Sequence, residues 1–410
     1  MLEDFRLVPV AVLIVVYVLI AKRSVFGRRV EIWMAMGIGA ALMLLSGSIS
    51  PYEALLSENI HVLIYLVGVL LIGAALNESG LLMYYFRRLF EHEESFFRAS
   101  LKLFLLIGLL SAVLMNDTLA IIMTPLMVEI SKRLNINEKF LLLMLAFAVT
   151  IGSVMTPIGN PQNLIIGLQM QNAFFYFAKY LALPTLVNLL VTYYLLGVFF
   201  RSRIPKRMNV SSLDYNIKDE RLAFLSKLSI VLLFALSVLN AALFFLVRRT
   251  FSLDLIALVS AFPVLLSRSS VRVLKRFDWK TIAFFVFMFI VMQAVYNSGF
   301  FQSFALGLFN NPVNIMFISI VLSQFLSNVP FVDLFVRFAG SSPINLVTLA
   351  AGSTIAGNFL VLGAASNIII IQTAEDRGGE GLSFMDFVKY GTATTLVNAA
   401  IYLFFIYLQL

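Results

Sequence analysis

The sequence contains no cysteine and only two histidines. The lack of cysteine excludes a disulfide framework, a thiolate metal site and a cysteine nucleophile. The histidines, His61 and His92, lie near the ends of apolar segments, and the chain has neither a His-Glu-x-x-His nor a Gly-x-Ser-x-Gly motif. We therefore expect that the protein is not an enzyme, and in particular not a metal-dependent or serine hydrolase within a membrane.

Charged residues are also scarce. Asp, Glu, Lys and Arg make up 13% of the 410 residues, whereas soluble domains contain about 25%. Hydrophobic residues make up 60% of the chain, and the mean hydropathy is +0.94. These values predict an all-α integral membrane protein that crosses the lipid bilayer many times, and we expect it in the plasma membrane.

The net charge of +8 does not indicate nucleic-acid binding. The basic residues gather in short loops between apolar segments, and the positive-inside rule places such loops in the cytoplasm. The loop 201–222 is one of them. The loop 50–60 has acidic but no basic residues and is predicted to lie outside, together with both chain termini. Arg248 and Arg249 fall on the predicted outer side and are the main exception to the rule.

Long apolar segments give the expected spans, since a helix needs about 20 apolar residues to cross a bilayer. The expected spans are 7–21, 33–49, 61–83, 140–172, 175–200, 223–247, 252–267, 281–299, 345–373 and 386–409.

Two further apolar stretches, 103–130 and 313–338, contain polar residues in or beyond their middle. Basic segments flank the first stretch on both sides, so it must enter and leave the membrane by the same face. With about 13 residues in each arm it is too short to cross twice at about 1.5 Å per residue. We therefore predict a re-entrant hairpin with its tip at 116–118. The same argument from the outer side predicts a second hairpin with its tip at 327–330.

These elements predict two units of five spans and one hairpin each. The first unit covers 1–200, the second covers 223–410, and the cytoplasmic loop 201–222 links them. The first unit begins outside and the second begins inside, so the two are predicted to be inverted repeats. Inverted repeats with discontinuous helices are a common plan of secondary transporters.

One span in each predicted repeat contains helix-breaking residues. The segment from Gly152 to Pro161, within 140–172, holds two prolines and two glycines and predicts a discontinuous helix. The span 345–373 has several glycines but no proline, so its predicted break rests on a weaker signal. When Asn163 is aligned with Asn367, Gly159 also aligns with Gly363.

Broken helices offer two kinds of binding group. Carbonyl, Asn and Ser oxygens suit Na⁺, whereas free amides at the positive end of a helix dipole suit an anion. The candidate substrate- and ion-binding residues at the tips and breaks are Asn116, Asp117, Thr118, Thr156, Gly159, Asn160, Asn163, Ser327, Asn328, Asn358, Gly363, Ser366 and Asn367. The candidate Na⁺ ligands among them are Asn116, Asp117, Asn163, Asn328 and Asn367. For the small residues of these segments, close helix packing is the alternative.

Acidic residues inside the predicted membrane region are functional candidates, because burying a charge there is costly. Asp117, at the first tip, could bind a cation or carry a proton, or could simply cap a helix. Asp333 could instead form an ion pair with Arg337, one turn later. Glu78 could mark an interfacial helix end. No Lys or Arg lies at the predicted midplane, which favours a small or neutral substrate over a multivalent anion.

The segments 116–118 and 123–125 resemble the first hairpin of the arsenite-permease (ArsB) and NhaD-type branch of the ion transporter superfamily. The segments 159–163, 327–330 and 357–367 resemble further motifs of that branch. The resemblance implies a citrate-transporter-like domain and a homodimer with a scaffold and a moving transport domain. Members of the superfamily move arsenite or antimonite, exchange Na⁺ for H⁺, or couple Na⁺ to sulfate or carboxylates. The dicarboxylate branch carries Ser-Asn-Thr at both tips, unlike this chain.

The leading hypothesis is a secondary active transporter that moves a small inorganic oxyanion or metalloid, such as arsenite, by alternating access. We expect H⁺ or Na⁺ coupling through Asp117 and no other cofactor. One alternative is a Na⁺/H⁺ antiporter or a Na⁺-coupled symporter of sulfate or a carboxylate. A passive channel is a further alternative, and it would not concentrate its substrate.

Overall fold

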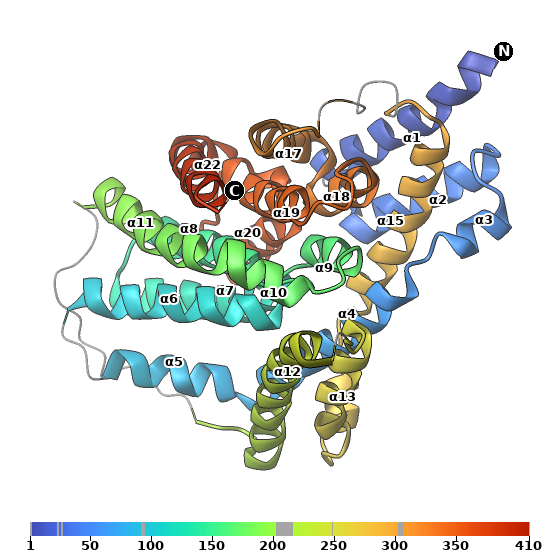
Figure 1. Ribbon diagram of the computed structural model, residues 1–410. Helices are drawn as coiled ribbons and strands as arrows, with labels where there is room; N and C mark the ends of the chain where they lie inside the picture. The colour runs from blue at the N-terminus through green and yellow to red at the C-terminus, as the bar shows by residue number, and fades with distance from the viewer. Residues whose placement is uncertain are drawn as a thin grey trace.

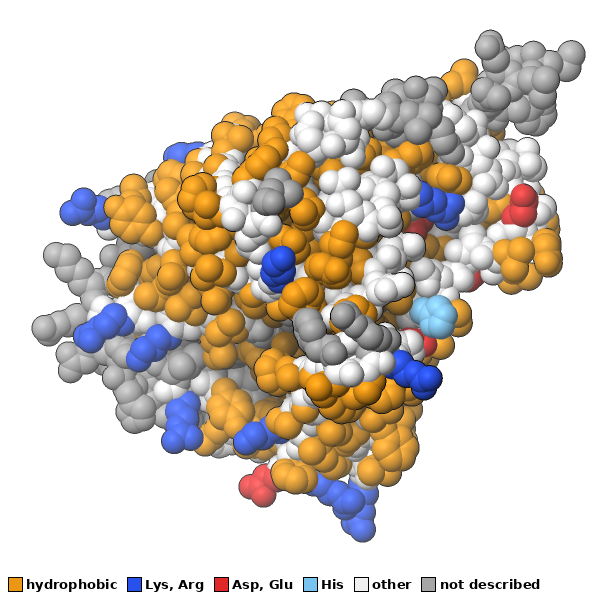
Figure 2. All heavy atoms as spheres, viewed as in Figure 1, with side chains coloured by type: hydrophobic (Ala, Val, Ile, Leu, Met, Phe, Trp, Pro, Cys, Tyr) orange, Lys and Arg blue, Asp and Glu red, His pale blue; other side chains and the backbone are white. Residues whose placement is uncertain are grey.

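Helices make up nearly all of the described chain. The computed structural model describes residues 2–22, 24–25, 28–91, 95–201, 216–247, 249–301, 307 and 309–409. Within these ranges, seven helices are long and apolar enough to cross a membrane. Hydrophobic side chains cover much of the exposed face in Figure 2, and acidic ones are few on it. The predicted all-α membrane class is therefore confirmed.

The elements of the first half are α1 (Leu2–Lys22), β1 (Ser24–Val25), β2 (Arg28–Arg29), α2 (Ile32–Leu45), α3 (Pro51–Leu56), α4 (Ile60–Ser79), α5 (Leu81–Glu91), α6 (Phe96–Leu114), α7 (Asn116–Leu134), α8 (Glu138–Gly152), η1 (Ser153–Met155), α9 (Pro161–Leu168), α10 (Ala173–Phe177), η2 (Ala178–Ala182) and α11 (Leu183–Phe199). The strands β1 and β2 form one short antiparallel pair. The π-helical segment η2 joins α10 to α11 without a break.

The elements of the second half are α12 (Glu220–Val247), α13 (Leu253–Leu265), α14 (Ser270–Lys275), α15 (Trp279–Asn297), α17 (Pro312–Leu326), α18 (Asn328–Phe335), η3 (Val336–Phe338), α19 (Pro343–Phe359), η4 (Val361–Gly363), α20 (Ala365–Asp376), α21 (Phe384–Asp386), η5 (Phe387–Gly391) and α22 (Thr392–Tyr407). A π-helical segment, η5, again joins two helices. Residues 202–215 of the expected linker lie outside the described residues, and α12 begins inside the range 201–222.

The helices form three groups, and each group combines both halves of the sequence (Figure 1). In the first group α1, α2 and α15 pack together. In the second, α4 packs against α12 and α13. The third and largest contains the helices from α6 to α11 and from α17 to α22, with contacts such as α7 to α20 and α9 to α18. The predicted repeats are therefore interleaved in space.

The first hairpin is longer than predicted. Its arms, α6 and α7, have 19 residues each rather than about 13, and Arg98 and Lys102 lie inside α6 instead of in a loop. The helices α6 and α8 are parallel, because Phe96 at the start of α6 and Phe140 at the start of α8 have ring centres 5.9 Å apart. The helix α7 packs against α8 in the antiparallel direction. The predicted arm length was too short because it assigned Arg98 and Lys102 to a loop, whereas both lie in the first turns of α6.

The second hairpin agrees more closely with the prediction. The helix α17 has 15 residues, and α18 with η3 completes the second arm at Phe338. One span boundary was wrong: α4 ends at Ser79 because Gly80 adopts a left-handed conformation with φ of +75°, and α5 is a separate helix. Whether the hairpins dip into the bilayer from opposite faces stays a prediction.

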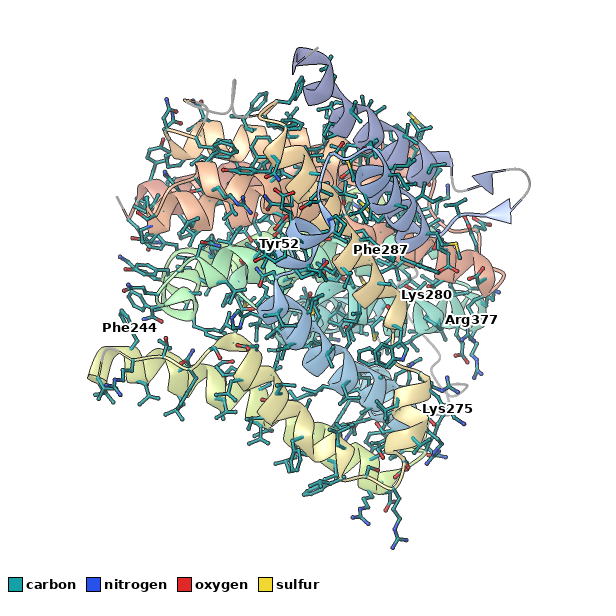
Figure 3. The ribbon with its side chains drawn as sticks, turned by 90° about the vertical axis from the view of Figure 1, so that its right-hand side faces the viewer. Tyr52, Phe244, Lys275, Lys280, Phe287 and Arg377 are labelled. Carbon is teal, nitrogen blue, oxygen red and sulfur yellow. The ribbon has the colours of Figure 1, made fainter. Side chains whose placement is uncertain are left out.

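Basic side chains lie together at one edge of the molecule. Lys275, Lys280 and Arg377 lie at one edge in Figure 3, whereas Phe244, near the end of α12, lies at the opposite edge. The helix α4 links these ends: His61 at its start contacts Asp254, and Glu78 near its end contacts Arg272 and Arg276. The basic edge is the predicted cytoplasmic face.

Candidate functional site

The first tip is a sharp reversal between α6 and α7. Met115 has a φ of +61°, which is uncommon for a residue other than glycine. The Asn116 N–H donates to the Gly159 carbonyl at 3.0 Å, and the Asn116 side-chain oxygen accepts from the Asp117 N–H at 2.9 Å. Asn116 is buried. The tip of the first hairpin is thereby attached to the first helix break.

The second tip repeats this geometry. Ser327 has a φ of +58°, and the Asn328 side-chain oxygen accepts from the Val329 N–H at 2.9 Å. The Tyr17 hydroxyl of α1 donates to the carbonyl of Leu326, the last residue of α17. The hydrogen bond connects the second tip to the group formed by α1, α2 and α15.

The first break is closed by asparagine side chains. After η1 the backbone is extended at Thr156, and Asn160 caps α9 by accepting the Asn163 N–H at 2.8 Å. The Asn163 amide donates to the carbonyls of Ser153 and Thr156 at 3.0 and 3.1 Å, and its oxygen accepts from Thr354 at 3.2 Å. Both carboxamides are fully buried and hold the broken segment in place.

The second break is confirmed although it contains no proline. Leu360 and Ala364 are extended on either side of η4, and a β-carbon on Gly363 would lie 2.5 Å from the Ala356 carbonyl oxygen. The Asn367 amide donates to the Gly357 carbonyl at 2.6 Å. Several buried oxygens around this break have no hydrogen-bond partner in the described chain; they are Asn358 Oδ1, Ser366 Oγ, Asn367 Oδ1 and Gln324 Oε1. At the first break the Gln162 Oε1 is likewise buried without a partner, whereas the Asn160 and Asn163 side chains are hydrogen-bonded through both oxygen and nitrogen.

Asp117 faces an open cleft of about 720 Å³. The cleft lies between α2 and α15 on one side and α7, α18 and α20 on the other. Glu31, Asp278 and Lys280 also line it, and Lys280 pairs with Glu31 at 2.7 Å. Asp278 caps α15 by accepting the Thr281 N–H at 3.2 Å. Within the described residues, the Asp117 carboxylate has no hydrogen-bond or ion-pair partner.

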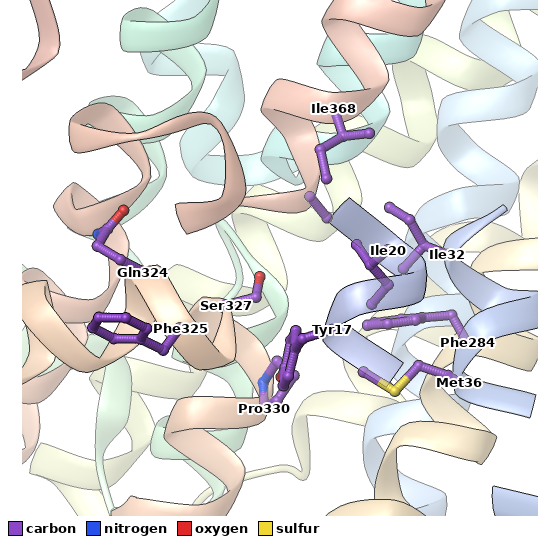
Figure 4. Close-up of a pocket in the computed structure, with 11 residues that line it drawn as sticks. Tyr17, Ile20, Ile32, Met36, Phe284, Gln324, Phe325, Ser327, Pro330 and Ile368 are labelled. Carbon is purple, nitrogen blue, oxygen red and sulfur yellow. The ribbon is translucent and has the colours of Figure 1, made fainter. Parts of the chain in front are cut away.

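A second cavity of about 490 Å³ adjoins this cleft and reaches the second tip (Figure 4). Gln324, Phe325 and Ser327 lie on one side of it, and Ile20, Met36 and Phe284 lie on the other. Three residues line both cavities; they are Ile32, Phe284 and Ala365. Ala365 is the first residue of α20, so the N-terminus of this helix lies where the two cavities meet.

The structure separates the predicted site residues into two sets. Asp117 and Ser327 line the two cavities. The remaining candidates do not line these two cavities; they are Asn116, Thr118, Thr156, Gly159, Asn160, Asn163, Asn328, Asn358, Gly363, Ser366 and Asn367. Most are buried behind the cavity walls, where several shape the tips and breaks through their hydrogen bonds.

Several cavity residues were not predicted from the sequence. Tyr17, Phe284 and Ala365 are apolar or small residues in apolar segments and give no signal. Glu31 and Lys280 each lie just before a predicted span. They are 249 positions apart in the sequence, so neither segment alone predicts that they form a pair.

The other acidic candidates have different surroundings. Asp333 and Arg337 form no direct ion-pair contact, although the charge of Arg337 acts on the Asp333 carboxylate: Arg337 donates to Gln293 at 3.1 Å and lies 4.2 Å from the Tyr296 ring centre. Asp333 lines neither of the two cavities. The Arg337 guanidinium instead contacts Gln293 and Tyr296 of α15.

Glu78 belongs to an ion-pair cluster at the basic edge. Its carboxylate contacts Arg276 at 2.8 Å and Arg272 at 3.4 Å. Arg272 also contacts Asp219 at 3.0 Å, and a hydrogen bond from Ser269 contributes most to holding the pKa of Asp219 below its usual value. The cluster ties the end of α4 to α14 and to the start of α12, which favours a structural role.

Comparisons with known proteins agree with this architecture. The family described as citrate transporter matches residues 15–341. An uncharacterized transporter of Mycobacterium bovis is 27% identical over 98% of this chain and 99% of its own length. The silicon efflux transporter of rice (Oryza sativa subsp. japonica) is 23% identical over 89% and 90%, and an inner membrane protein of Escherichia coli is 27% identical over 77% and 80%.

The fold is also similar to a solved structure. The crystal structure of the YdaH transporter of Alcanivorax borkumensis, described as having an unusual topology, matches 99% of this chain and 97% of its own with a TM-score of 0.52 and 14% identity. The resemblance to the ion transporter superfamily is confirmed by these matches. The family match covers most of the sequence, and the chain is therefore a membrane transporter that belongs to the citrate transporter family.

Proposed function

We propose that the protein is a secondary active transporter of a small inorganic oxyanion or metalloid, coupled to protons through Asp117. The observation that carries this proposal is the position of Asp117. Its carboxylate lies at the tip between α6 and α7, faces an open cleft and has no partner among the described residues. A carboxylate in this position can exchange a proton with the cleft.

The charge of the cleft argues against citrate as the substrate. Three carboxylates and one ammonium group line the cleft, and the ammonium of Lys280 is paired with Glu31. Asp117 and Asp278 would therefore repel a multivalent carboxylate. An uncharged hydroxylated acid, such as the acid of arsenite or of silicon, meets no such repulsion. The similarity to a silicon efflux transporter supports this substrate class.

Coupling requires that protonation favour one of two conformations. The cleft separates α2 and α15 from α7, α18 and α20, so movement of the second set against the first would close it. Neutral Asp117 can approach Asp278 during such a closure, whereas two carboxylates repel each other. The matched tips, breaks and π-helical segments of the two halves support the proposal that they are inverted repeats with alternating access.

Na⁺/H⁺ exchange is a second candidate, and one observation favours it. The unpartnered oxygens of Asn358, Ser366, Asn367 and Gln324 flank the second break, and hard oxygen ligands of this kind suit Na⁺. In this alternative two of the five Na⁺ candidates have an oxygen without a partner in the described chain: Asp117 at the first tip and Asn367 at the second break.

Uptake into proteoliposomes distinguishes these functions. We expect arsenite or silicic acid to accumulate above its external concentration when a proton gradient is imposed, and to equilibrate without one. Citrate at the same concentration should not accumulate. Empty liposomes are the control. Accumulation of citrate, or equilibration of every solute regardless of gradient, would contradict the proposal; Na⁺ movement that drives proton movement would favour the exchanger.

A further inference from the structure

A separate polar cavity shares none of its lining residues with the Asp117 cleft. It has about 510 Å³ of open space and is formed by the end of α9, the start of α10, the end of α12 and the start of α13. His61 at the start of α4 contacts Asp254 near this cavity, whereas Glu78 near the end of α4 contacts Arg276, two residues before Asp278 of the Asp117 cleft.

Two helices point their N-termini at this cavity. The continuous helix Ala173–Phe199 begins after Asn172, and α13 begins after Ser252. Ala173, Phe174, Ser252 and Leu253 line the cavity. Neither N-cap side chain forms a capping hydrogen bond, so no N-cap side chain satisfies the first-turn N–H groups. Free N–H groups and the positive end of a helix dipole attract anions.

Asn172 supplies an independent sign of a ligand. It lines the cavity and is only 3% exposed, and its side-chain Nδ2 has no hydrogen-bond partner among the described residues. A buried donor without a partner is rare in folded proteins and usually faces a water, an ion or a ligand. Its N–H groups offer two further donors beside the start of the helix.

The cavity has charges of both signs near it, although none of its lining residues is charged. Asp254, in the first turn of α13, does not line it; one oxygen of its carboxylate contacts His61 of α4 at 3.0 Å, and the other, Oδ1, is buried without a hydrogen-bond partner in the described chain. Arg249 is exposed in the loop just before Thr250 of the cavity wall, and it adds a positive charge there. Asn240 fixes this loop by bonding both the N–H and the carbonyl of Phe251, at 2.6 and 3.2 Å.

We propose that this cavity is a binding site for a small oxyanion, distinct from the transport cleft. Asn172 and the first turns of the two helices donate hydrogen bonds to it. The site would lie on the predicted outer face and explains why Arg249 occurs there, against the positive-inside rule. The proposal does not depend on the transported substrate.

Thermal unfolding of the full-length protein in an uncharged, lipid-free detergent tests this site, with sulfate as the probe and chloride at equal ionic strength as the reference. We expect a saturable rise in the unfolding midpoint with sulfate, because a ligand that binds the folded state stabilises it. Asn172→Leu should weaken the apparent affinity by about tenfold or more. Asn172→Asp keeps the shape of the side chain and should abolish the effect by repulsion, which covers the case in which the leucine variant does not fold.

Gln169→Leu is the matched control. Gln169 is an exposed amide in the same loop that does not line the cavity, so its variant should respond to sulfate as the parent does. Asp117→Asn should also keep the response, which separates this site from the transport cleft. If phosphatidylglycerol competes with sulfate, the natural source of the oxyanion is a lipid headgroup. If it does not compete, the natural ligand is a free anion. The proposal is overturned if sulfate has no saturable effect, or if both Asn172 variants respond like the parent.

Discussion

Replacing Asp117 by asparagine is expected to abolish the proton dependence of transport and leave the fold intact. Asparagine has nearly the same shape but cannot gain or lose a proton. Because the Asp117 carboxylate has no partner among the described residues, its replacement breaks no hydrogen bond or ion pair. We expect accumulation driven by a proton gradient to fall by roughly tenfold or more, with solute flux no longer responding to the gradient. Uptake into proteoliposomes at several pH values measures this.

Asp333→Asn is the matched control for this result. Asp333 is the acidic residue of the second hairpin, but it lines neither cavity. Its variant should retain the dependence on the proton gradient. If Asp117→Asn transports with unchanged proton dependence, or if the two variants lose it equally, Asp117 is not the coupling residue.

A single methyl group at Gly152 is expected to prevent normal packing of the first hairpin. Gly152 ends α8 where it crosses α6, and a β-carbon there would lie 2.0 Å from the Gly108 carbonyl oxygen. The contact is with backbone, which cannot rotate away. Overpacking of this kind costs about 1–3 kcal/mol and more where the backbone must move. We expect Gly152→Ala to lower the unfolding midpoint strongly or to prevent recovery of folded protein.

Gly197→Ala provides the comparison. A β-carbon at Gly197, in α11, would meet only the Phe97 ring, at 3.6 Å, which is ordinary contact. Alanine favours a helix over glycine by about 1 kcal/mol, so this variant should be as stable as the parent or slightly more so. Equal stability of the two variants, measured by thermal unfolding in detergent, would mean that α6 and α8 do not approach so closely.

Much of the fold could be predicted because membrane-spanning helices require long apolar segments, in which polar or helix-breaking residues are conspicuous. Polar or helix-breaking residues within apolar segments located both tips and both breaks, since the backbone at such places must be buried in protein or line a cavity. The second break was the harder case, because Gly363 rather than proline allows it. Arm lengths were less predictable, since basic residues such as Arg98 can lie inside a helix near its end.

The candidate site was harder to predict than the fold. The asparagines were expected to bind substrate, yet the Asn163 side-chain amide donates its hydrogen bonds to backbone carbonyls of its own break. Sequence spacing shows that a polar side chain is buried but not which groups it satisfies. The cavity walls opposite the tips were not predicted, because Tyr17 of the second cavity and Phe284 of both cavities resemble any lipid-facing residue. Only long-range packing places them opposite the tips.

The most direct test of a shared substrate cleft is the reactivity of one cysteine at the place where the two cavities meet. The chain has no cysteine of its own, so Ala365→Cys gives a single label site. A membrane-impermeant maleimide added to either side of proteoliposomes should label it from the side of Lys280, and the transported solute should slow that labelling. Labelling that is absent from both sides, or that proceeds at the same rate with and without the solute, would contradict a transport cleft between the hairpin tips.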